Sequence, residues 1–296
     1  MLIVGVIILS LQDSLIKYMA SETSFWQLQF IRSIGNIILL FLIAKLTNGI
    51  DILFPIKWKP VYLRALTMTT CMFCFFAASP KLSFAQMAAG LYTFPLFVSF
   101  LAVIFLNERV GVWRLFALIL GSFGALLILE PWSKNFTYLQ FLPIMAGFFF
   151  ACNIILIRKY CRKESVMSLT LAVGVMFFIS ALLGILFFEL IFQNNFLKEI
   201  SPFVFIGWPS LTLIIFTFCF SCSILNIIGN ILLAKAYQTA ESSWLAPMDY
   251  SYLVFAAIWG KIFFGVWPTL LNLIGMFFIA FSGILIAVRE QRKNEA

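Results

Sequence analysis

The sequence predicts an all-α membrane protein with ten transmembrane helices, arranged as two inverted five-helix repeats. Hydrophobic residues make up 63% of its 296 residues and charged residues only 11%, whereas a soluble domain has roughly 45–50% apolar and about 25% charged residues. The apolar residues form long unbroken runs, which argues against the alternating pattern of a β-barrel. Motifs in the first half also recur weakly in the second, which indicates a repeat.

Five apolar spans are expected in the first half, each bounded by charged or turn-forming residues. About 20 apolar residues are enough to cross the hydrocarbon core of a bilayer, and each run approaches this length. The first run has no basic residue before it, so we expect no cleavable signal peptide and a few natural residues upstream of Met1. The spans lie near residues 2–19, 25–45, 61–78, 83–106 and 112–129.

The second half is expected to contain five spans of the same kind. The longest connections, near residues 46–59 and 192–210, are too short to fold as separate domains. Any function is therefore expected inside the helix bundle or at its mouths. The five spans lie near residues 139–158, 168–191, 211–233, 243–264 and 269–288.

The repeat is carried by cysteines and glycines at corresponding places. A Cys-x-x-Cys stretch begins at Cys71 in the third span and at Cys219 in the eighth. Glycines in the fifth span are matched in the tenth by others: Gly121, Gly124, Gly275 and Gly283. Because five helices is an odd number, the second copy enters the membrane from the opposite side, as in many secondary transporters. The predicted repeats are residues 1–131 and 139–290.

The distribution of charge predicts the orientation. With ten spans both termini share one side, and most Lys and Arg residues fall there, including a cluster at residues 158–163. Both termini are therefore expected in the cytoplasm, with the protein in a bacterial inner membrane. Despite the net charge of +8, the basic residues form no patch for nucleic acid. The chain has no His, which excludes imidazole bases and His-ligated metals, and no cofactor is expected.

The order and spacing of several motifs resemble the EamA-type carriers of the drug/metabolite transporter superfamily. The resemblance implies a small-molecule carrier, often an exporter of amino acids or related metabolites. The family often has an acid after its ninth helix, but residues 264–268 read Phe-Gly-Val-Trp-Pro, so no role of that acid is carried over. The motifs are Asp13-Ser14-Leu15-Ile16-Lys17, Phe30-Ile31-Arg32, Leu63-Arg64-Ala65, Tyr92-Thr93-Phe94-Pro95-Leu96 and Leu106-Asn107-Glu108-Arg109.

Ionisable residues within spans are candidates for function because they are costly in lipid. Asp13 and Lys17 lie four residues apart on one helix face, so they form either a local ion pair or part of a gate or substrate site. Arg32 either pairs with an acid on a neighbouring helix or contacts an anionic substrate group. Arg64 lies nearer the cytoplasmic edge and is expected to anchor its span.

Two prolines interrupt spans at comparable places in the two halves, Pro95 in the fourth and Pro247 in the ninth. Such interruptions are a sequence pointer to a transporter site, although both prolines could instead bend helices only for packing. Asp249 lies within one turn of Pro247 and is the acid most strongly indicated as substrate-binding.

Uncharged polar residues complete the candidate substrate site. Ser223, Asn226 and Asn230 recur at helical spacing, so they should face the bundle interior, where they bind substrate or only link helices. The Cys-x-x-Cys stretches lie mid-span without a supporting acid, which favours helix packing over metal binding. The predicted substrate-binding residues are Gln12, Asp13, Gln86, Tyr92, Asn153, Asn226, Asn230 and Asp249, with Pro95 and Pro247 as kinks.

These features predict a secondary transporter that exports small amphipathic or cationic metabolites, such as amino acids, by alternating access around a central cavity. Its partners are the solute and the lipid bilayer, and without His any coupled proton would have to use Asp13 or Asp249. The cavity walls are expected mainly from spans one, three, four, six, eight and nine. Two other classes remain as alternatives, a membrane-embedded enzyme and a scaffold without transport, while the oligomeric state is left open.

Overall fold

The computed structural model describes residues 1–47, 49–106, 112–133, 136–191, 198, 202–239 and 248–294, and every regular element among them is a helix. Pro247 and the stretch Asn107-Glu108-Arg109 lie outside the described residues. The helices are α1 (Leu2–Tyr18), α2 (Phe25–Leu46), α3 (Trp58–Ala77), α4 (Phe84–Leu91), α5 (Phe94–Leu106), α6 (Val112–Leu129), α7 (Leu142–Tyr160), α8 (Val166–Leu186), α10 (Pro202–Phe205), α11 (Leu213–Thr239), α13 (Ser251–Phe264) and α14 (Leu270–Asn294).

Seven helical segments among the described residues are long and apolar enough to cross a membrane. They match the first four predicted spans and the sixth to the eighth. Three shorter apolar helices, Leu115–Leu129, Ser251–Phe264 and Leu270–Leu285, match the other three spans. The helical class of the protein is therefore confirmed, while ten crossings stay a prediction.

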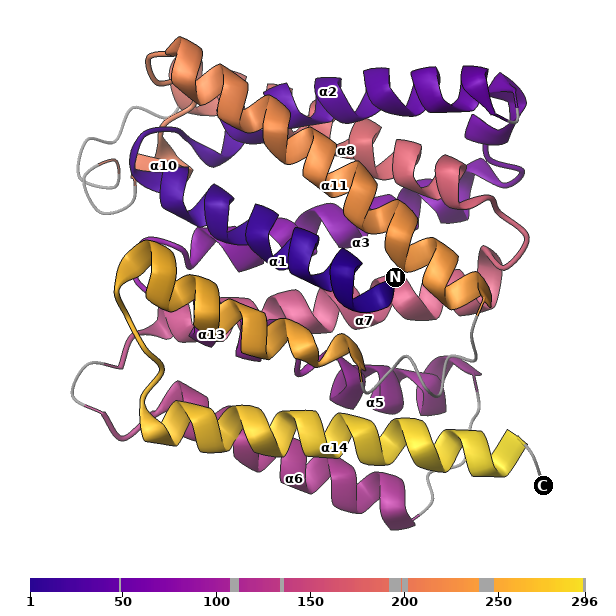
Figure 1. The fold of residues 1–296 in the computed structure, drawn as a ribbon, viewed down its shortest axis with the longest axis vertical. Helices are drawn as coiled ribbons and strands as arrows, with labels where there is room; N and C mark the ends of the chain where they lie inside the picture. The colour runs from indigo at the N-terminus through magenta and orange to yellow at the C-terminus, as the bar shows by residue number, and fades with distance from the viewer. Residues whose placement is uncertain are drawn as a thin grey trace.

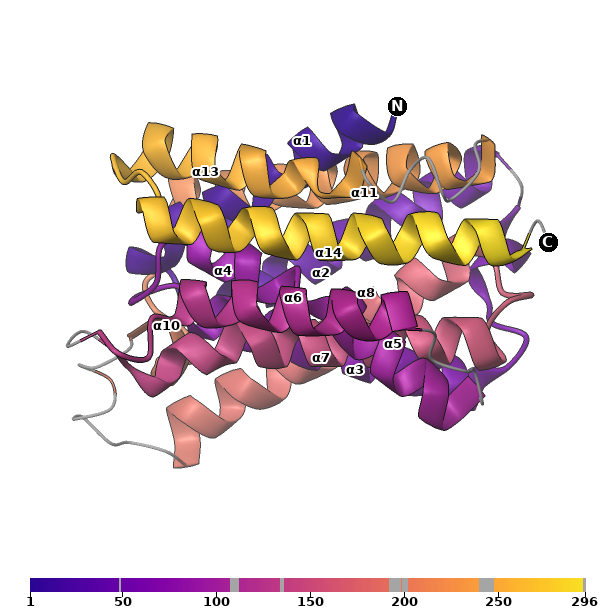
Figure 2. The same cartoon turned by 90° about the horizontal axis from the view of Figure 1, so that it is seen from below.

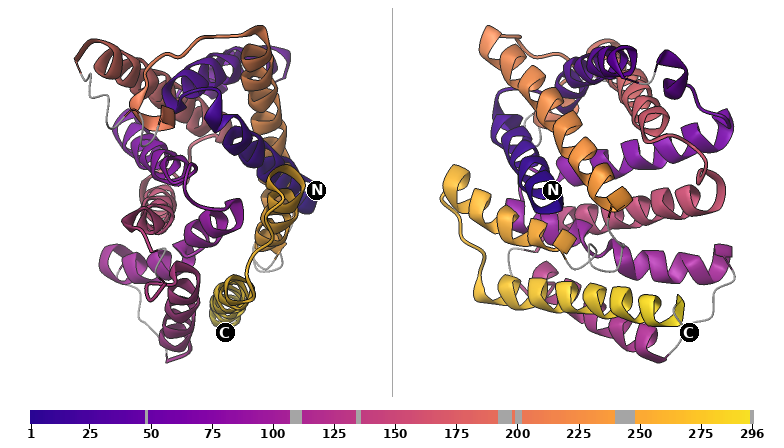
Figure 3. Two further views of the ribbon diagram at one scale, coloured as in Figure 1. Left: turned by 90° about the vertical axis from the view of Figure 1, so that its left-hand side faces the viewer. Right: turned by 45° about the vertical axis from the view of Figure 1, so that its right-hand side comes forward.

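The long helices lie roughly side by side, and segments distant in sequence pack together (Figure 1, Figure 2). Helix α6 packs on α14, α3 on α7, α2 on α8, and α1 on both α11 and α13. The α6–α14 pair lies at one end of the long axis and α2 at the other (Figure 1, Figure 3). The start of α1 and the end of α14 point to the same side of the bundle (Figure 1).

Glycines allow helices to pack closely at two of these contacts. A Cβ atom added to Gly124 of α6 would lie 2.7 Å from the carbonyl oxygen of Gly275 on α14, and one added to Gly275 would lie 2.7 Å from that of Gly124. A Cβ atom on Gly5 of α1 would lie 3.2 Å from the carbonyl oxygen of Gly229 on α11. Small residues at such contacts are a common means of helix association in lipid. The two glycine-bearing helices of the sequence repeat therefore pack against each other.

Replacing Gly124 by Leu is expected to lower the free energy of unfolding by about 1–3 kcal/mol, the usual penalty for overpacking. The side chain would have to separate α6 from α14. The midpoint of thermal unfolding in detergent checks this. Ile119→Leu on the same helix, where the side chain is 63% exposed, is the control and should leave the midpoint unchanged. A wild-type midpoint for Gly124→Leu would contradict the close helix contact.

Candidate functional site

A central cavity of about 250 Å³ lies among the helices that carry most of the predicted polar residues. This volume is slightly below the range of about 300–1,000 Å³ that is typical of small-molecule sites. Two acids, two arginines, amides and a tyrosine pair line it together with apolar side chains. The polar and aromatic lining residues are Gln12, Asp13, Arg32, Asn36, Arg64, Tyr92, Phe94, Phe150, Thr170, Phe177, Asn226, Asn230, Asp249 and Tyr252.

Asp13 is held in the cavity wall by neutral donors from two helices. One oxygen of its carboxylate accepts a hydrogen bond from the hydroxyl of Tyr252 on α13 at 2.7 Å, and the other accepts one from the Nε2 atom of Gln12 at 2.9 Å. Ser10, one turn earlier, accepts a hydrogen bond from the indole of Trp259 at 3.0 Å. Helix α1 is therefore joined to α13 by two polar contacts, and the first of them fixes the acid.

The polar stripe of α11 faces the interior, as its helical spacing predicts. The amide of Asn226 donates to Gln12 Oε1 at 2.9 Å and accepts from Asn36 at 3.4 Å. The amide of Asn230 donates to the carbonyl oxygen of Asn226 at 2.7 Å. Ser223 is fully buried, and its hydroxyl donates to the carbonyl oxygen of Arg32 at 3.1 Å. Asn226 therefore links α11 to both α1 and α2.

Replacing Asn226 by Leu is expected to lower the free energy of unfolding by about 1–3 kcal/mol, because the amides of Gln12 and Asn36 would each lose a buried partner. The thermal unfolding midpoint measures this. Ile228→Leu, whose side chain is 43% exposed on the same helix, provides the control. Equal midpoints for Asn226→Leu and the wild type would show that the bridge between α1, α2 and α11 does not stabilise the fold.

The fourth predicted span is broken at Tyr92 and Thr93, between α4 and α5. Helix α4 ends at Leu91, and the hydroxyl of Thr93 donates to the carbonyl oxygen of Gly90 at 2.7 Å. Pro95 occupies the first turn of α5, where its missing N–H has no helical partner to lose. The break places the ring of Tyr92 in the cavity wall, stacked on Tyr252 with 5.2 Å between ring centroids.

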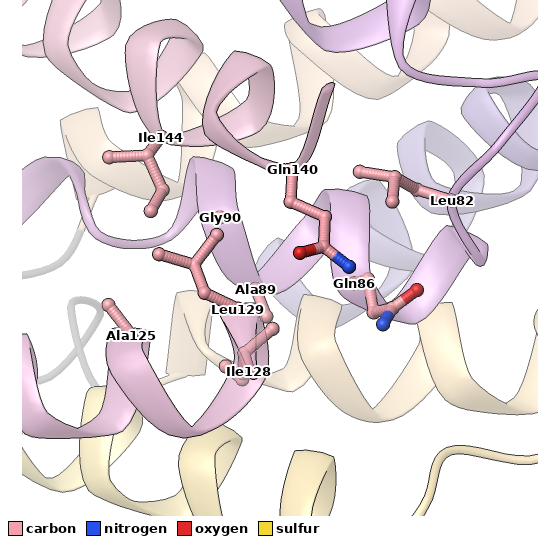
Figure 4. Close-up of a pocket in the computed structure, with 9 residues that line it drawn as sticks. All are labelled: Leu82, Gln86, Ala89, Gly90, Ala125, Ile128, Leu129, Gln140 and Ile144. Atoms are coloured by element: carbon pink, nitrogen blue, oxygen red, sulfur yellow. The ribbon is translucent and has the colours of Figure 1, made fainter. Parts of the chain in front are cut away.

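Two predicted residues lie away from this cavity. The side chain of Gln86 closes a capping box with Ser83 at the start of α4, and it lines a separate pocket of only about 10 Å³ (Figure 4). That volume holds no more than about one water molecule. Asn153 is buried in α7 with its Oδ1 atom unbonded among the described residues, and it is not among the cavity-lining side chains. Asp249, just before α13, lines the cavity and is half-buried.

The prediction of a local ion pair between Asp13 and Lys17 is wrong, because no ion pair forms between these two described side chains. The ammonium of Lys17 instead donates to the carbonyl oxygens of Ser79 and Leu82, the latter at 2.8 Å. These carbonyls lie in the turn between α3 and α4, so Lys17 ties the end of α1 to that turn. Its Nζ atom also lies 5.1 Å from the ring centroid of Phe264 on α13.

Helices α2 and α8, which are the second and seventh predicted spans, contribute side chains to the cavity. The sequence did not predict them as part of its walls. Arg32 and Asn36 reach it from α2, and Thr170 and Phe177 from α8. Gln29, Arg32 and Asn36 recur on α2 at i, i+3 and i+7, the same signal that identified the α11 stripe. Arg64, expected only as an anchor, also lines the cavity, and its Nη1 atom donates to the carbonyl oxygen of Leu169 at 2.9 Å.

Comparison with known proteins points to one family. Residues 1–130 match the model of the EamA-like transporter family. A riboflavin transporter of Vibrio cholerae is 26% identical over 71% of this chain and 64% of its own length. An S-adenosylmethionine uptake transporter of Rickettsia bellii is 26% identical over 68% of this chain and 62% of its own. A pseudopaline exporter of Pseudomonas aeruginosa is 21% identical over 94% of this chain and 89% of its own.

The likeness to the first two transporters spans somewhat less than two thirds of their length. A crystal structure of another protein aligns with 97% of this chain and 95% of its own at a TM-score of 0.53 and 14% identity, which shows a shared fold. The resemblance that the sequence motifs indicate is therefore confirmed: the chain is a multi-pass integral membrane protein whose residues 1–130 match the EamA-like transporter family and which is similar in sequence to named transporters.

Proposed function

We propose that the protein is a secondary transporter that exports a small amphipathic metabolite with a cationic group, such as an amino acid or a relative of one. The observation that carries this proposal is the central cavity, in which the Asp13 carboxylate lies beside the stacked rings of Tyr92 and Tyr252. A carboxylate next to aromatic faces suits a cationic group attached to an apolar body. The cavity also receives side chains from both halves of the chain, as alternating access requires.

The relatives agree on transport and differ in cargo and direction. They are named for riboflavin, for S-adenosylmethionine uptake and for pseudopaline export. The pseudopaline exporter aligns over most of both chains, which favours export here. The cavity lining, rather than any one relative, is the basis for the substrate class that we propose.

The helix contacts support two inverted five-helix repeats, residues 1–131 and 139–290. If each predicted span is related to the one five places later, α1 corresponds to α7, α2 to α8, α3 to α11, and α6 to α14. The contact of α3 with α7 then corresponds to that of α11 with α1, while the α2–α8 and α6–α14 contacts each map onto themselves. This is the pattern expected of an internal two-fold relation. One repeat would rock against the other around the cavity.

The same arrangement supports ten crossings of a bacterial inner membrane, with both termini in the cytoplasm. The start of α1 and the end of α14 point to one side of the bundle (Figure 1), as an even number of crossings requires. With ten crossings, most of the Lys and Arg residues are expected on that side, which would make it the cytoplasmic side under the positive-inside rule. Asp13 and Asp249 are the cavity acids available to carry a coupled proton.

Counterflow in proteoliposomes tests the proposal. Vesicles loaded with one unlabelled solute are diluted into its labelled form, with and without a pH gradient. The panel holds amino acids, polyamines, quaternary amines, nucleosides, riboflavin and S-adenosylmethionine. Accumulation of an amino acid or a cationic solute above protein-free vesicles is the expected result, and dependence on the gradient would assign proton coupling. Folded protein with no counterflow of any solute would favour a role without transport.

A further inference from the structure

Arg32 is a buried cation, and no acid among the described residues forms an ion pair with it. Its side chain is only 3% exposed, and its Nε atom is buried without a hydrogen-bond partner in the part of the chain that the structure describes. Its Cζ atom lies 5.4 Å from the ring centroid of Phe177, but a ring face satisfies none of the five N–H donors of an arginine. A buried charge of this kind is costly unless it is paired.

The nearby acid does not meet this need. Asp13 lines the same cavity from α1, and both of its oxygens accept hydrogen bonds from the neutral donors Gln12 and Tyr252. Asp13 and Arg32 are close enough to attract each other electrostatically. No ion pair joins these two described side chains. The cavity holds a fixed negative group and a separate, unsatisfied positive group.

Arg32 lies on a helix face with further unsatisfied amides. Gln29, one turn earlier, is fully buried, and neither its Oε1 nor its Nε2 atom is bonded among the described residues. Asn36, one turn later, lines the cavity, and its Oδ1 atom has no hydrogen-bond partner among the described residues. Arg64 of α3 adds a second guanidinium to the lining, and its Nε atom likewise lacks a partner in the described part of the chain. Buried polar groups are normally hydrogen-bonded, so the cavity wall at Arg32, Asn36 and Arg64 is suited to a polar ligand.

We infer that the guanidinium of Arg32 binds a carboxylate of the transported solute, with Asp13 and the tyrosine pair receiving its ammonium group. This inference rests on the proposed carrier function and narrows its substrate class from cationic to zwitterionic. A carboxylate fits because it accepts two parallel hydrogen bonds from one guanidinium. Arg64, bonded to the carbonyl oxygen of Leu169, supplies positive potential rather than the primary contact.

Matched solute pairs that differ only in the carboxylate test the inference. L-phenylalanine, L-leucine and L-lysine are compared with their amides as stabilisers of the purified protein against heat, and the same pairs compete in counterflow. In the wild type, at least one amide should need an about 10- to 100-fold higher concentration than its acid for the same stabilisation, as expected when a hydrogen bond to a charged group is lost. In Arg32→Gln, acid and amide should give the same stabilisation at equal concentrations. Arg32→Lys should keep part of the difference between them.

The control variant is Lys261→Gln, which removes an exposed cation from α13 and should keep the full difference between acid and amide. A merely structural role for Arg32 would lower the unfolding midpoint of Arg32→Gln without solute and leave the ratio of acid to amide unchanged. If Arg32→Gln does not fold, the ratio of acid to amide concentrations in Arg32→Lys is compared with the wild-type ratio. A ratio unchanged from the wild type would contradict the carboxylate contact, and a smaller difference between acid and amide would support it.

The two proposals fail in different ways. Transport of amines and amides as readily as of acids, or an unchanged preference in Arg32→Gln, overturns the carboxylate site and leaves the carrier function standing. Stabilisation by none of the three acids likewise overturns the carboxylate site. Absence of counterflow for the whole panel contradicts the carrier function and this inference together.

Discussion

Replacing Asp13 by Asn is expected to lower counterflow about 10- to 100-fold, because the variant loses the negative charge that receives the cationic group of the solute. The fold should persist. An amide at this position can still accept from Gln12 and can donate to the hydroxyl oxygen of Tyr252, because a hydroxyl also serves as an acceptor. Initial rates of counterflow at several solute concentrations, in vesicles of equal protein content, measure the effect.

Glu22→Gln is the matched control for Asp13→Asn. It makes the same change from acid to amide at an exposed position just after α1, and wild-type transport is expected. If Asp13 carries only a coupled proton, Asp13→Asn will lose accumulation driven by a pH gradient but keep counterflow. If both activities match the wild type at several pH values, Asp13 has neither role.

Replacing Gly283 by Val should disrupt the tyrosines behind the cavity. A Cβ atom at this position of α14 would overlap the hydroxyl and ring of Tyr250. The Tyr250 ring lies 5.5 Å from that of Tyr92, which in turn stacks on Tyr252. We expect the free energy of unfolding to fall by about 1–3 kcal/mol, and transport to fall as well, because displaced rings would crowd the site. Thermal unfolding and counterflow of one preparation give both quantities.

A double variant shows whether Tyr250 transmits the effect of Gly283→Val. Removing the obstructing ring in Gly283→Val/Tyr250→Ala should make the Val substitution less destabilising than it is alone, since the two residues are in contact and their effects should not add. Additive losses would place the origin of the defect elsewhere. A single variant with wild-type stability and transport would contradict the packing of Gly283 on Tyr250.

The helices could be predicted because lipid leaves long apolar runs few alternatives. The α11 stripe could be predicted for a related reason, since Asn226 and Asn230 at helical spacing must face protein rather than lipid. Gln29, Arg32 and Asn36 on α2 have the same spacing, so this second stripe could have been predicted by the same argument. Ser83-x-x-Gln86 likewise has the spacing of a capping box, which accounts for Gln86 without a substrate.

Other features depend on contacts that no local pattern contains. Lys17 could have paired with Asp13 on its own helix, yet its ammonium binds carbonyl oxygens more than sixty residues later in the chain. The donor that instead fixes Asp13 is Tyr252, on a helix of the other half. Such partners are set by tertiary packing, which for this chain depends on glycine contacts between distant helices.

The central claim is that the cavity is the solute site of a carrier, and a cysteine placed in its wall tests this most directly. The amide of Asn230 bonds to the carbonyl oxygen of Asn226 on its own helix, so Asn230→Cys should leave the helix contacts in place. Sealed vesicles of this variant are treated from either side with a charged, membrane-impermeant thiol reagent, with and without a solute found by counterflow. The wild type, whose six cysteines are free, gives the background.

We predict that Cys at position 230 is labelled from both sides and that the solute slows labelling at concentrations that also saturate counterflow. Both results follow if the cavity opens alternately to each side and the solute occupies it. Labelling that the solute does not affect, in vesicles that still transport it, would contradict the account and place the solute path elsewhere.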